Sequence, residues 1–196
     1  MYFILELLGT VAFAISGTMV GVQAHMDMLG TTVLGLTTAV GGGVIRDLLI
    51  GVTPPAAFQQ PVYALVAIAV SLIVFIPPIR KRINTNAMIL ILIDAVGLGV
   101  FTVTGVKSGI TFTNPFLQIF LGVVTGVGGG VLRDMFAMQK PAIFVRHFYA
   151  IASLIGAAVC YFLLSVNDNA AMIAGISVIV VLRILAAAFK WHLPKT

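Results

Sequence analysis

The sequence predicts an all-α integral membrane protein with seven transmembrane helices, arranged as an inverted 3+3 repeat plus a seventh helix. The first observation is composition: of the 196 residues, 60% are apolar and 9% are charged, whereas soluble domains carry roughly 25% charged residues. So few charged side chains cannot cover the surface that a soluble domain of this length exposes to water, and much of the surface must contact lipid. The second observation is an internal repeat, which predicts how the helices are arranged.

Seven apolar runs are each long enough to cross the hydrocarbon layer, which takes about 20 helical residues. Short polar or turn-forming connectors separate the runs, so neighbouring helices are expected to be antiparallel. The runs use most of the chain, and we therefore expect residues 1–196 to form a single transmembrane domain. The runs are Tyr2–Val22, Met28–Ile50, Ala56–Ile79, Ala87–Val106, Pro115–Met138, Ile143–Val166 and Ala170–Phe189.

The distribution of Lys and Arg predicts the orientation in the membrane. One side of the predicted bundle collects most of these residues, whereas the other side carries only Arg46 and Lys107 near its boundary. The positive-inside rule then places the N-terminus outside and the C-terminus in the cytoplasm. This asymmetry explains the net charge of +5 without a nucleic-acid partner. The residues on the cytoplasmic side are Arg80, Lys81, Arg82, Lys140, Arg146, Lys190 and Lys195.

The internal repeat is strong. The segment LGLTTAVGGGVIRD at residues 34–47 returns as LGVVTGVGGGVLRD at residues 121–134, with ten of fourteen positions identical. Further matches extend the repeated unit to three helices. The first copy is residues 1–79 and the second is residues 87–166, and the seventh helix, residues 170–190, lies outside the repeat. Because the unit has an odd number of spans, the second copy enters the membrane from the opposite side. The further matches pair Glu6 with Asp94, Gly9 with Gly97, Phe13 with Phe101, Gly17 with Gly105, Pro54 with Pro141 and Tyr63 with Tyr149.

Each copy carries three consecutive glycines in the middle of a span. Each glycine costs about 1 kcal/mol of helix propensity relative to Ala, which predicts that the second and fifth helices break or kink there. Broken backbone inside a membrane must line protein or a wet cavity, where freed carbonyls could coordinate a cation. The alternative is close helix packing through small residues. Thr38 and Thr125, one turn earlier, either line the pore or bond back to their own helix. The glycines are Gly41, Gly42, Gly43, Gly128, Gly129 and Gly130.

An Arg-Asp pair follows each glycine triplet within one turn. Placing an ionisable side chain at this depth in the membrane costs free energy. These groups are therefore expected to form ion pairs and to face the interior of the bundle. Adjacent residues of a helix do not face each other, and each Arg is therefore expected to find a partner on another helix. Such pairs either lock helices together or frame the permeation path and set its electric field. The motif residues are Arg46, Asp47, Arg133 and Asp134, and the expected partners at matching depth are Glu6 for Arg46 and Asp94 for Arg133.

Other polar residues have simpler interpretations. Lys107 ends the fourth span, where it either gates the outer mouth or extends its amine to the membrane surface. Arg183 in the seventh helix is expected to reach cytoplasmic headgroups or to pack against the bundle. The single Cys160 excludes a cysteine metal cluster. We find no nucleophile elbow, phosphate loop or carboxylate dyad, so the sequence predicts no enzyme, no cofactor and no metal beyond transient permeant K⁺ or Na⁺.

Two copies of GGGxxRD in the second and fifth of seven helices, each followed by Pro54 or Pro141, resemble the bacterial branch of the trimeric intracellular cation channel family. The resemblance covers nearly the whole chain. It implies a homotrimer in the bacterial inner (plasma) membrane, surrounded by lipids, in which each protomer has its own pore. The pore would be lined by the kinked second and fifth helices and would pass K⁺ and, less selectively, Na⁺. Related bacterial sequences are also labelled glycine transporters.

Physical chemistry alone leaves the transported solute open. The Arg-Asp motif is net neutral, so backbone carbonyls could dominate the field along a cation path. The same groups would suit a small amino acid such as glycine, with its carboxylate toward an Arg or a helix N-terminus and its amine toward an Asp. A membrane scaffold without transport is the third alternative. Ohmic current favours a channel, whereas saturable uptake with alternating access favours a transporter.

Overall fold

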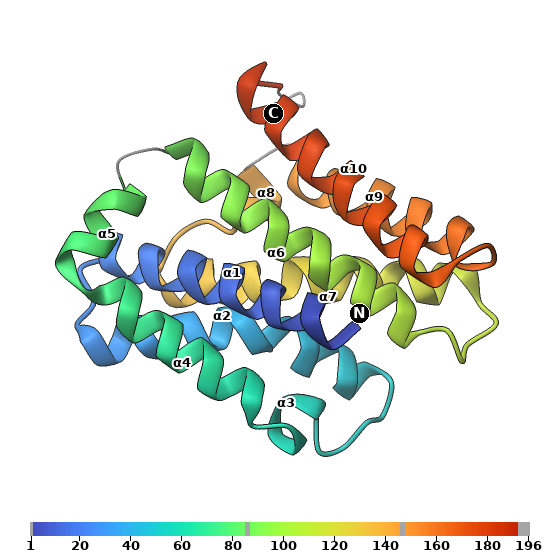
Figure 1. Cartoon of the computed structure of the whole chain (residues 1–196), viewed down its shortest axis with the longest axis horizontal. Helices are drawn as coiled ribbons and strands as arrows, with labels where there is room; N and C mark the ends of the chain where they lie inside the picture. The colour runs from blue at the N-terminus through green and yellow to red at the C-terminus, as the bar shows by residue number, and fades with distance from the viewer. Residues whose placement is uncertain (1, 85–86, 146–147, 192–196) are drawn as a thin grey trace.

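The structure is a computed structural model that describes residues 2–84, 87–145 and 148–191, so Arg146 and Lys195 lie outside the described residues. All of its regular elements are helices (Figure 1). The five long ones are α1 (Tyr2–Gln23), α2 (Met28–Leu49), α6 (Ala87–Ser108), α7 (Pro115–Phe136) and α10 (Asp168–Ala188). The shorter ones are α3 (Ala56–Gln59), α4 (Val62–Phe75), α5 (Pro77–Asn84), α8 (Ala142–Val145) and α9 (Tyr149–Leu164).

Polar connectors start three of the long helices by capping them. The Asp27 carboxylate accepts a hydrogen bond from the Gly30 amide at 2.7 Å at the start of α2. The Asn114 side chain accepts from the Phe116 amide at 2.9 Å before α7, and Asn167 does the same for α10. Each cap satisfies amides that a helix N-terminus otherwise leaves without a partner.

Within the part of the chain that the structure describes, five helices are long and apolar enough to cross a membrane, and the number rises to six if α4 and α5 are taken as one bent span. The expected run Ala56–Ile79 is not one helix. Pro61 precedes α4, and a 91° bend separates α4 from α5 at Pro77, because proline disfavours a helical conformation in the residue before it. The expected run Ile143–Val166 is likewise divided between α8 and the 16-residue apolar helix α9. The all-helical membrane fold is therefore confirmed, with two of its expected spans shorter than predicted.

The repeat is visible in the packing. In Figure 1, α1 and α6 lie beside each other and run in opposite directions, and so do α2 and α7. Within each copy the three main helices contact one another: α1, α2 and α4 in the first, and α6, α7 and α9 in the second. Helix α10 stands outside this pattern and packs against α6 and α9.

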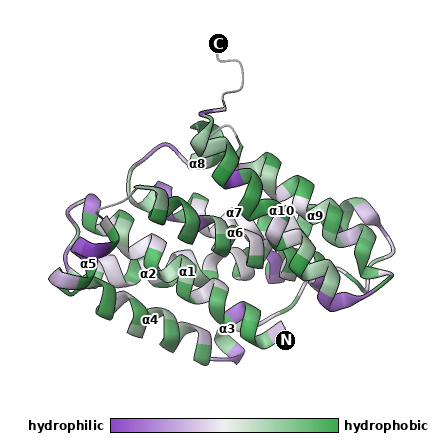
Figure 2. Cartoon of the chain, turned by 45° about the horizontal axis from the view of Figure 1, so that its top comes forward, coloured by the Kyte–Doolittle hydropathy of each residue, from purple (hydrophilic) through white to green (hydrophobic). Residues whose placement is uncertain are grey.

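Hydrophobic residues predominate along the helices (Figure 2), and many large apolar side chains are exposed on the outside of the bundle. Leu29, Phe116 and Phe162 each expose more than two thirds of their surface. Lipid can accept such faces without cost, whereas water cannot. Inside, Phe13 and Phe101, which occupy equivalent positions in the two copies, pack with their ring centroids 5.2 Å apart.

Candidate permeation site

The glycine triplets form the crossing point of α2 and α7. Both helices are unbroken through their triplets, so the predicted breaks are absent. A Cβ atom at Gly42 would overlap the backbone carbonyl of Thr125, and one at Gly129 would overlap that of Thr38. The missing side chains therefore let two backbones touch, and the contact offsets the low helix propensity of glycine. Close packing, the alternative interpretation of the triplets, describes this structure.

The other triplet glycines have different surroundings. Gly41 packs against the Leu132 side chain, Gly128 against the Gly42 backbone, and Gly130 against the Tyr149 hydroxyl. Gly43 instead lines a cavity, and a Cβ there would meet nothing closer than an Arg46 nitrogen at 3.8 Å. Only part of each triplet is thus needed for the crossing.

Thr38 and Thr125 are fully buried beside this crossing. Each hydroxyl donates a 2.6 Å hydrogen bond to a carbonyl four residues earlier in its own helix, to Leu34 and to Leu121 respectively. Of the two alternatives for these residues, the structure shows back-bonding to the helix.

The Arg-Asp motif folds in the same way in both copies. Arg46 Nε donates to Asp47 Oδ1 at 2.8 Å, and Arg133 Nε donates to Asp134 Oδ1 at 2.8 Å. The expectation that neighbours in sequence would not pair is therefore wrong. The pairing is possible because the arginine side chain is long enough to fold back and bring its guanidinium to the carboxylate of the next residue.

Each aspartate also holds the segment that follows. Asp47 Oδ2 accepts a hydrogen bond from the Ala56 amide at 2.8 Å, and Asp134 Oδ2 accepts one from the Ala142 amide at 2.7 Å. These amides lie at the starts of α3 and α8. One carboxylate thus neutralises an arginine and anchors a returning loop.

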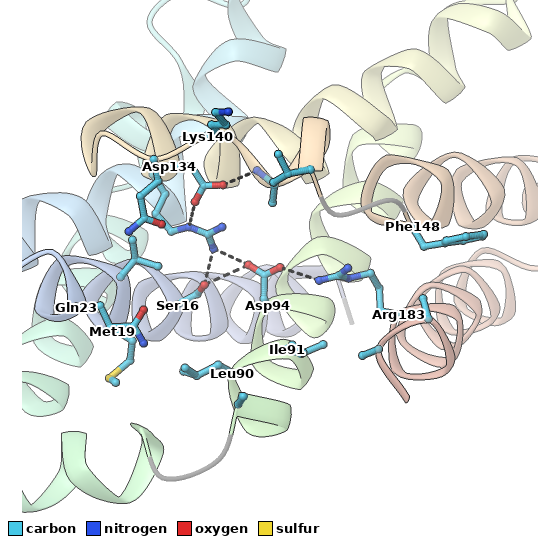
Figure 3. A pocket seen from close by; sticks show the side chains of 18 of the residues that line it. Ser16, Met19, Gln23, Leu90, Ile91, Asp94, Asp134, Lys140, Phe148 and Arg183 are labelled. Carbon is cyan, nitrogen blue, oxygen red and sulfur yellow. Dashed lines mark hydrogen bonds and ion pairs between the residues drawn. The ribbon is translucent and has the colours of Figure 1, made fainter. Parts of the chain in front are cut away.

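The expected pair of Asp94 with Arg133 is present (Figure 3). Arg133 Nη1 lies 2.6 Å from Asp94 Oδ1, and Ser16 joins them by accepting from Nη1 at 2.6 Å and donating to Oδ1 at 3.1 Å. Arg183 reaches the same carboxylate from α10, with Nη2 3.7 Å from Asp94 Oδ2. Asp94 therefore faces two guanidinium groups, from α7 and from α10.

The expected pair of Glu6 with Arg46 is not among the ion pairs of the described residues. Glu6 accepts instead a 2.6 Å hydrogen bond from the Tyr63 hydroxyl, and Arg46 pairs with Asp47. The copies also differ in that α10 supplies a second guanidinium to Asp94, whereas Glu6 binds the Tyr63 hydroxyl. The repeat aligns Tyr63 with Tyr149 but predicts no role for either residue, and no sequence pattern links Arg183 to Asp94.

Two cavities lie on opposite sides of the glycine crossing, because α2 and α7 run in opposite directions and each Arg-Asp motif follows its own triplet. The larger has a volume of about 750 Å³ and the smaller of about 150 Å³. The charged residues that line the larger are Asp94, Arg133, Asp134, Lys140, Arg183 and Lys190. Those that line the smaller are Glu6, Arg46 and Asp47. The larger cavity is therefore basic and the smaller acidic.

Lys107 takes part in neither lining. Its amine forms a 2.6 Å ion pair with Asp168 and lies 5.9 Å from the centre of the Tyr2 ring. The pair is partly exposed and ties the end of α6 to the start of α10. This contact supports a role in joining helices at the bundle end.

The family model described as Glycine transporter matches the chain twice, over residues 3–77 and 91–165. The chain belongs to this family. Similar members include the inner membrane protein YadS of Escherichia coli K12, 37% identical with 96% of this chain and 92% of that protein covered. The membrane protein YvgT of Bacillus subtilis is 34% identical, with 98% and 95% covered. This glycine-transporter family member is accordingly a multi-pass protein of the inner membrane.

Solved structures confirm the resemblance to the cation channels. A TRIC cation channel studied for the structural basis of its conductance has a TM-score of 0.89 and 39% identity, with 98% of this chain and 96% of that chain covered. The TRIC orthologue of Rhodobacter sphaeroides has a TM-score of 0.88 and 32% identity, with 97% and 98% covered. The structural neighbours of this family member are thus trimeric intracellular cation channels.

Proposed function

We propose that this chain is a monovalent cation channel, with K⁺ as its main permeant ion and one pore in each protomer of a homotrimer. Its resemblance to TRIC channels over nearly the full length supports both the channel activity and the trimer. The observation that carries the pore assignment is the pair of charged cavities on opposite sides of the crossing of α2 and α7. A route that joins these cavities must pass the contact between Gly42 and Gly129.

In this proposal the structure represents a closed pore. The backbones at the crossing touch, and the Phe13 ring lies 3.3 Å from the position of a Cβ at Gly129. Conduction then requires α2 and α7 to move apart, which needs no broken helix. Polar backbone and the hydroxyls of Thr38 and Thr125 would be the first groups that an ion meets in the opened crossing.

The proposed orientation puts the acidic cavity outside and the basic cavity in the cytoplasm, with the N-terminus out and the C-terminus in. Arg80, Lys81 and Arg82 on α5, together with Lys140 and Lys190, then face the cytoplasm, as the positive-inside rule requires. The 91° bend after α4 would lay α5 along anionic headgroups on that side. An outer mouth with Glu6 and Asp47 would attract cations.

The deciding experiment uses purified protein in liposomes and in planar bilayers. We expect ohmic single-channel K⁺ currents, which rise linearly with voltage, and no saturable uptake of labelled glycine. Liposomes without protein, prepared alongside, give the background leak. Saturable glycine uptake without K⁺ current would overturn the channel proposal.

A secondary transporter for glycine is the second candidate. The family description favours it, and so does the cavity that places the Arg183 guanidinium beside the Asp94 carboxylate, because a zwitterion needs both charges. Alternating access of a cysteine introduced into each cavity, measured with a thiol reagent, would support it. If the protein is a channel, the cysteines in both cavities should react with the thiol reagent at the same time in the open state.

The hydrogen bond between Tyr63 and Glu6 leads to a stability prediction with a matched control. Tyr63→Phe removes a donor to a carboxylate at 2.6 Å, and we expect a loss of about 1.5–3 kcal/mol. Tyr149→Phe removes a buried hydroxyl that has no hydrogen-bond partner among the described residues, and we expect little loss. Thermal unfolding in detergent measures both. Equal losses would show that the contact with Glu6 does not matter.

A further inference from the structure

Phe13 on α1 lies between the two cavities. Thr10 lines the smaller cavity and Ser16 lines the larger one, and Phe13 is three residues from each. Steps of three residues keep successive side chains next to each other on the helix surface. The distance from Thr10 to Ser16 along the helix is about 9 Å. Phe13 is only 1% exposed and, within the described part of the chain, lines neither cavity.

Helix α6 shows the same arrangement in the opposite direction. Asp94 lines the larger cavity, where it accepts a hydrogen bond from Ser16 (Figure 3), and Phe101 lines the smaller one. Gly97 lies between them. A Cβ at Gly97 would overlap the Phe13 ring, so this ring fills the space over Gly97 that separates the two linings.

The Phe13 ring also contacts the glycine crossing. One of its ring carbons lies 3.3 Å from the position of a Cβ at Gly129, which is one turn before Arg133 in the lining of the larger cavity. On its other side the Phe13 ring packs against Phe101, with the ring centroids 5.2 Å apart. Phe101 therefore borders the smaller cavity, and Phe13 lies behind it, enclosed by α6 and α7.

Two apolar rings in this place form a barrier to ions. A cation that passes them must give up water, and the rings replace little of that hydration. A narrow apolar constriction also empties of water readily, which stops conduction without a blocking charge. Core packing alone accounts for two buried phenylalanines, but it gives no reason for them to lie where the polar linings of both cavities end.

We propose that Phe13, backed by Phe101, is a hydrophobic gate that closes the passage between the two cavities. The gate opens when the Phe13 ring leaves the space over Gly97. Separation of α2 and α7 at the glycines would release one side of the ring, because the ring packs against Gly129. The inference rests on the proposed route between the cavities, and its test uses a second permeant, water, that does not depend on the choice of ion.

The test measures K⁺ flux and osmotic water permeability on the same proteoliposomes, the latter by stopped-flow light scattering. Phe13→Ala removes the ring, and the protein-dependent water permeability is expected to rise about tenfold or more, a change that needs the barrier to fall by only about 1.4 kcal/mol. K⁺ flux is expected to rise with it. Phe13→Leu keeps a large apolar side chain and should stay near wild type.

Phe13→Asn separates polarity from size. Asparagine is about as large as leucine, but its amide can hold water in the constriction. Water permeability should therefore rise in the Asn variant and stay low in the Leu variant. This comparison decides the question if the Ala variant does not fold, and equal permeability of folded Asn and Leu variants would overturn the gate.

Met172→Ala is the matched control for a loosened core. Met172 is likewise 1% exposed, lies on α10, and is absent from the described linings of both cavities. Its removal should leave both permeabilities unchanged. An equal rise in this control would show that any lost core side chain makes the bundle leak, which would contradict a specific role of Phe13. Thermal unfolding in detergent identifies the folded variants.

The two readouts distinguish the gate from the channel proposal. A rise in water permeability without K⁺ flux in any variant would support the gate and contradict the K⁺ channel. K⁺ flux in wild type with neither quantity changed in a folded Phe13→Ala variant would support the channel and overturn the gate.

Discussion

Replacement of Gly42 and Gly129 by Ala together is expected to raise K⁺ flux through the protein and to lower its stability. Each new Cβ would overlap a carbonyl oxygen of the opposite helix, that of Thr125 or that of Thr38. Backbone at a helix crossing cannot move aside as a side chain can, so α2 and α7 must separate. Overpacking of this kind costs about 1–3 kcal/mol per site, and occasionally more.

Gly43→Ala is the matched control. It lies in the same triplet and gains the same methyl group, but the nearest atom to its Cβ is an Arg46 nitrogen at 3.8 Å. The control should be slightly more stable than wild type, because alanine favours a helix by about 1 kcal/mol over glycine. Its K⁺ flux should stay near that of the wild type.

Both quantities are measured on the same preparations, by thermal unfolding in detergent and by K⁺ flux in liposomes. An unchanged melting temperature in the double variant would mean that the helices do not touch at the glycines. A folded double variant with less flux than wild type would mean that the crossing is not the barrier. Either result would remove the basis for the pore assignment.

Asp94→Asn is expected to be the most destabilising conservative change at a charged residue of this chain. The substitution leaves Arg133 and Arg183 buried with Asp134 as the only remaining carboxylate of the network. Removal of one partner from a buried ion pair costs about 3–5 kcal/mol, because the other charge stays desolvated. Glu6→Gln is the control from the first copy. Glu6 is only partly buried and bonds to the neutral Tyr63 hydroxyl, so a smaller loss is expected.

A second substitution should rescue the first. Arg183→Gln in the Asp94→Asn background leaves Arg133 paired with Asp134 at 2.8 Å and removes the unbalanced charge. We therefore expect the double variant to recover most of the lost stability, a strongly non-additive result. Additive losses in thermal unfolding would show that the two arginines do not share Asp94.

The same network predicts the outcome of a charge reversal. Exchange of Asp94 and Arg133 would restore a simple pair, but here it would place an arginine beside Arg183 and an aspartate beside Asp134. The exchange should therefore fail where the neutral rescue succeeds. This distinction arises because α10, which lies outside the repeat, contributes to only one of the two sites.

Sequence reasoning predicted the membrane fold, the repeat and the pairing of Asp94 with Arg133. Composition alone excludes a soluble domain, and ten identities in fourteen positions predict two equivalent helices. Equal depth along neighbouring helices was enough to match a carboxylate with a guanidinium. Matching by depth failed for Glu6 and Arg46, because depth does not indicate whether another group lies closer. In the structure, Tyr63 binds Glu6 and Asp47 binds Arg46.

The tertiary structure decided what the glycines do. Propensity is a property of one helix and favours a break at a glycine triplet, whereas the observed helices stay whole because the same glycines permit backbone contact across the crossing. The tertiary structure also brings Arg183 into an ion pair with Asp94, which is 89 positions away in the chain. Patterns along a sequence report hydrophobicity and local preference. Contacts between helices depend on how the helices pack, and only the folded bundle contains that information.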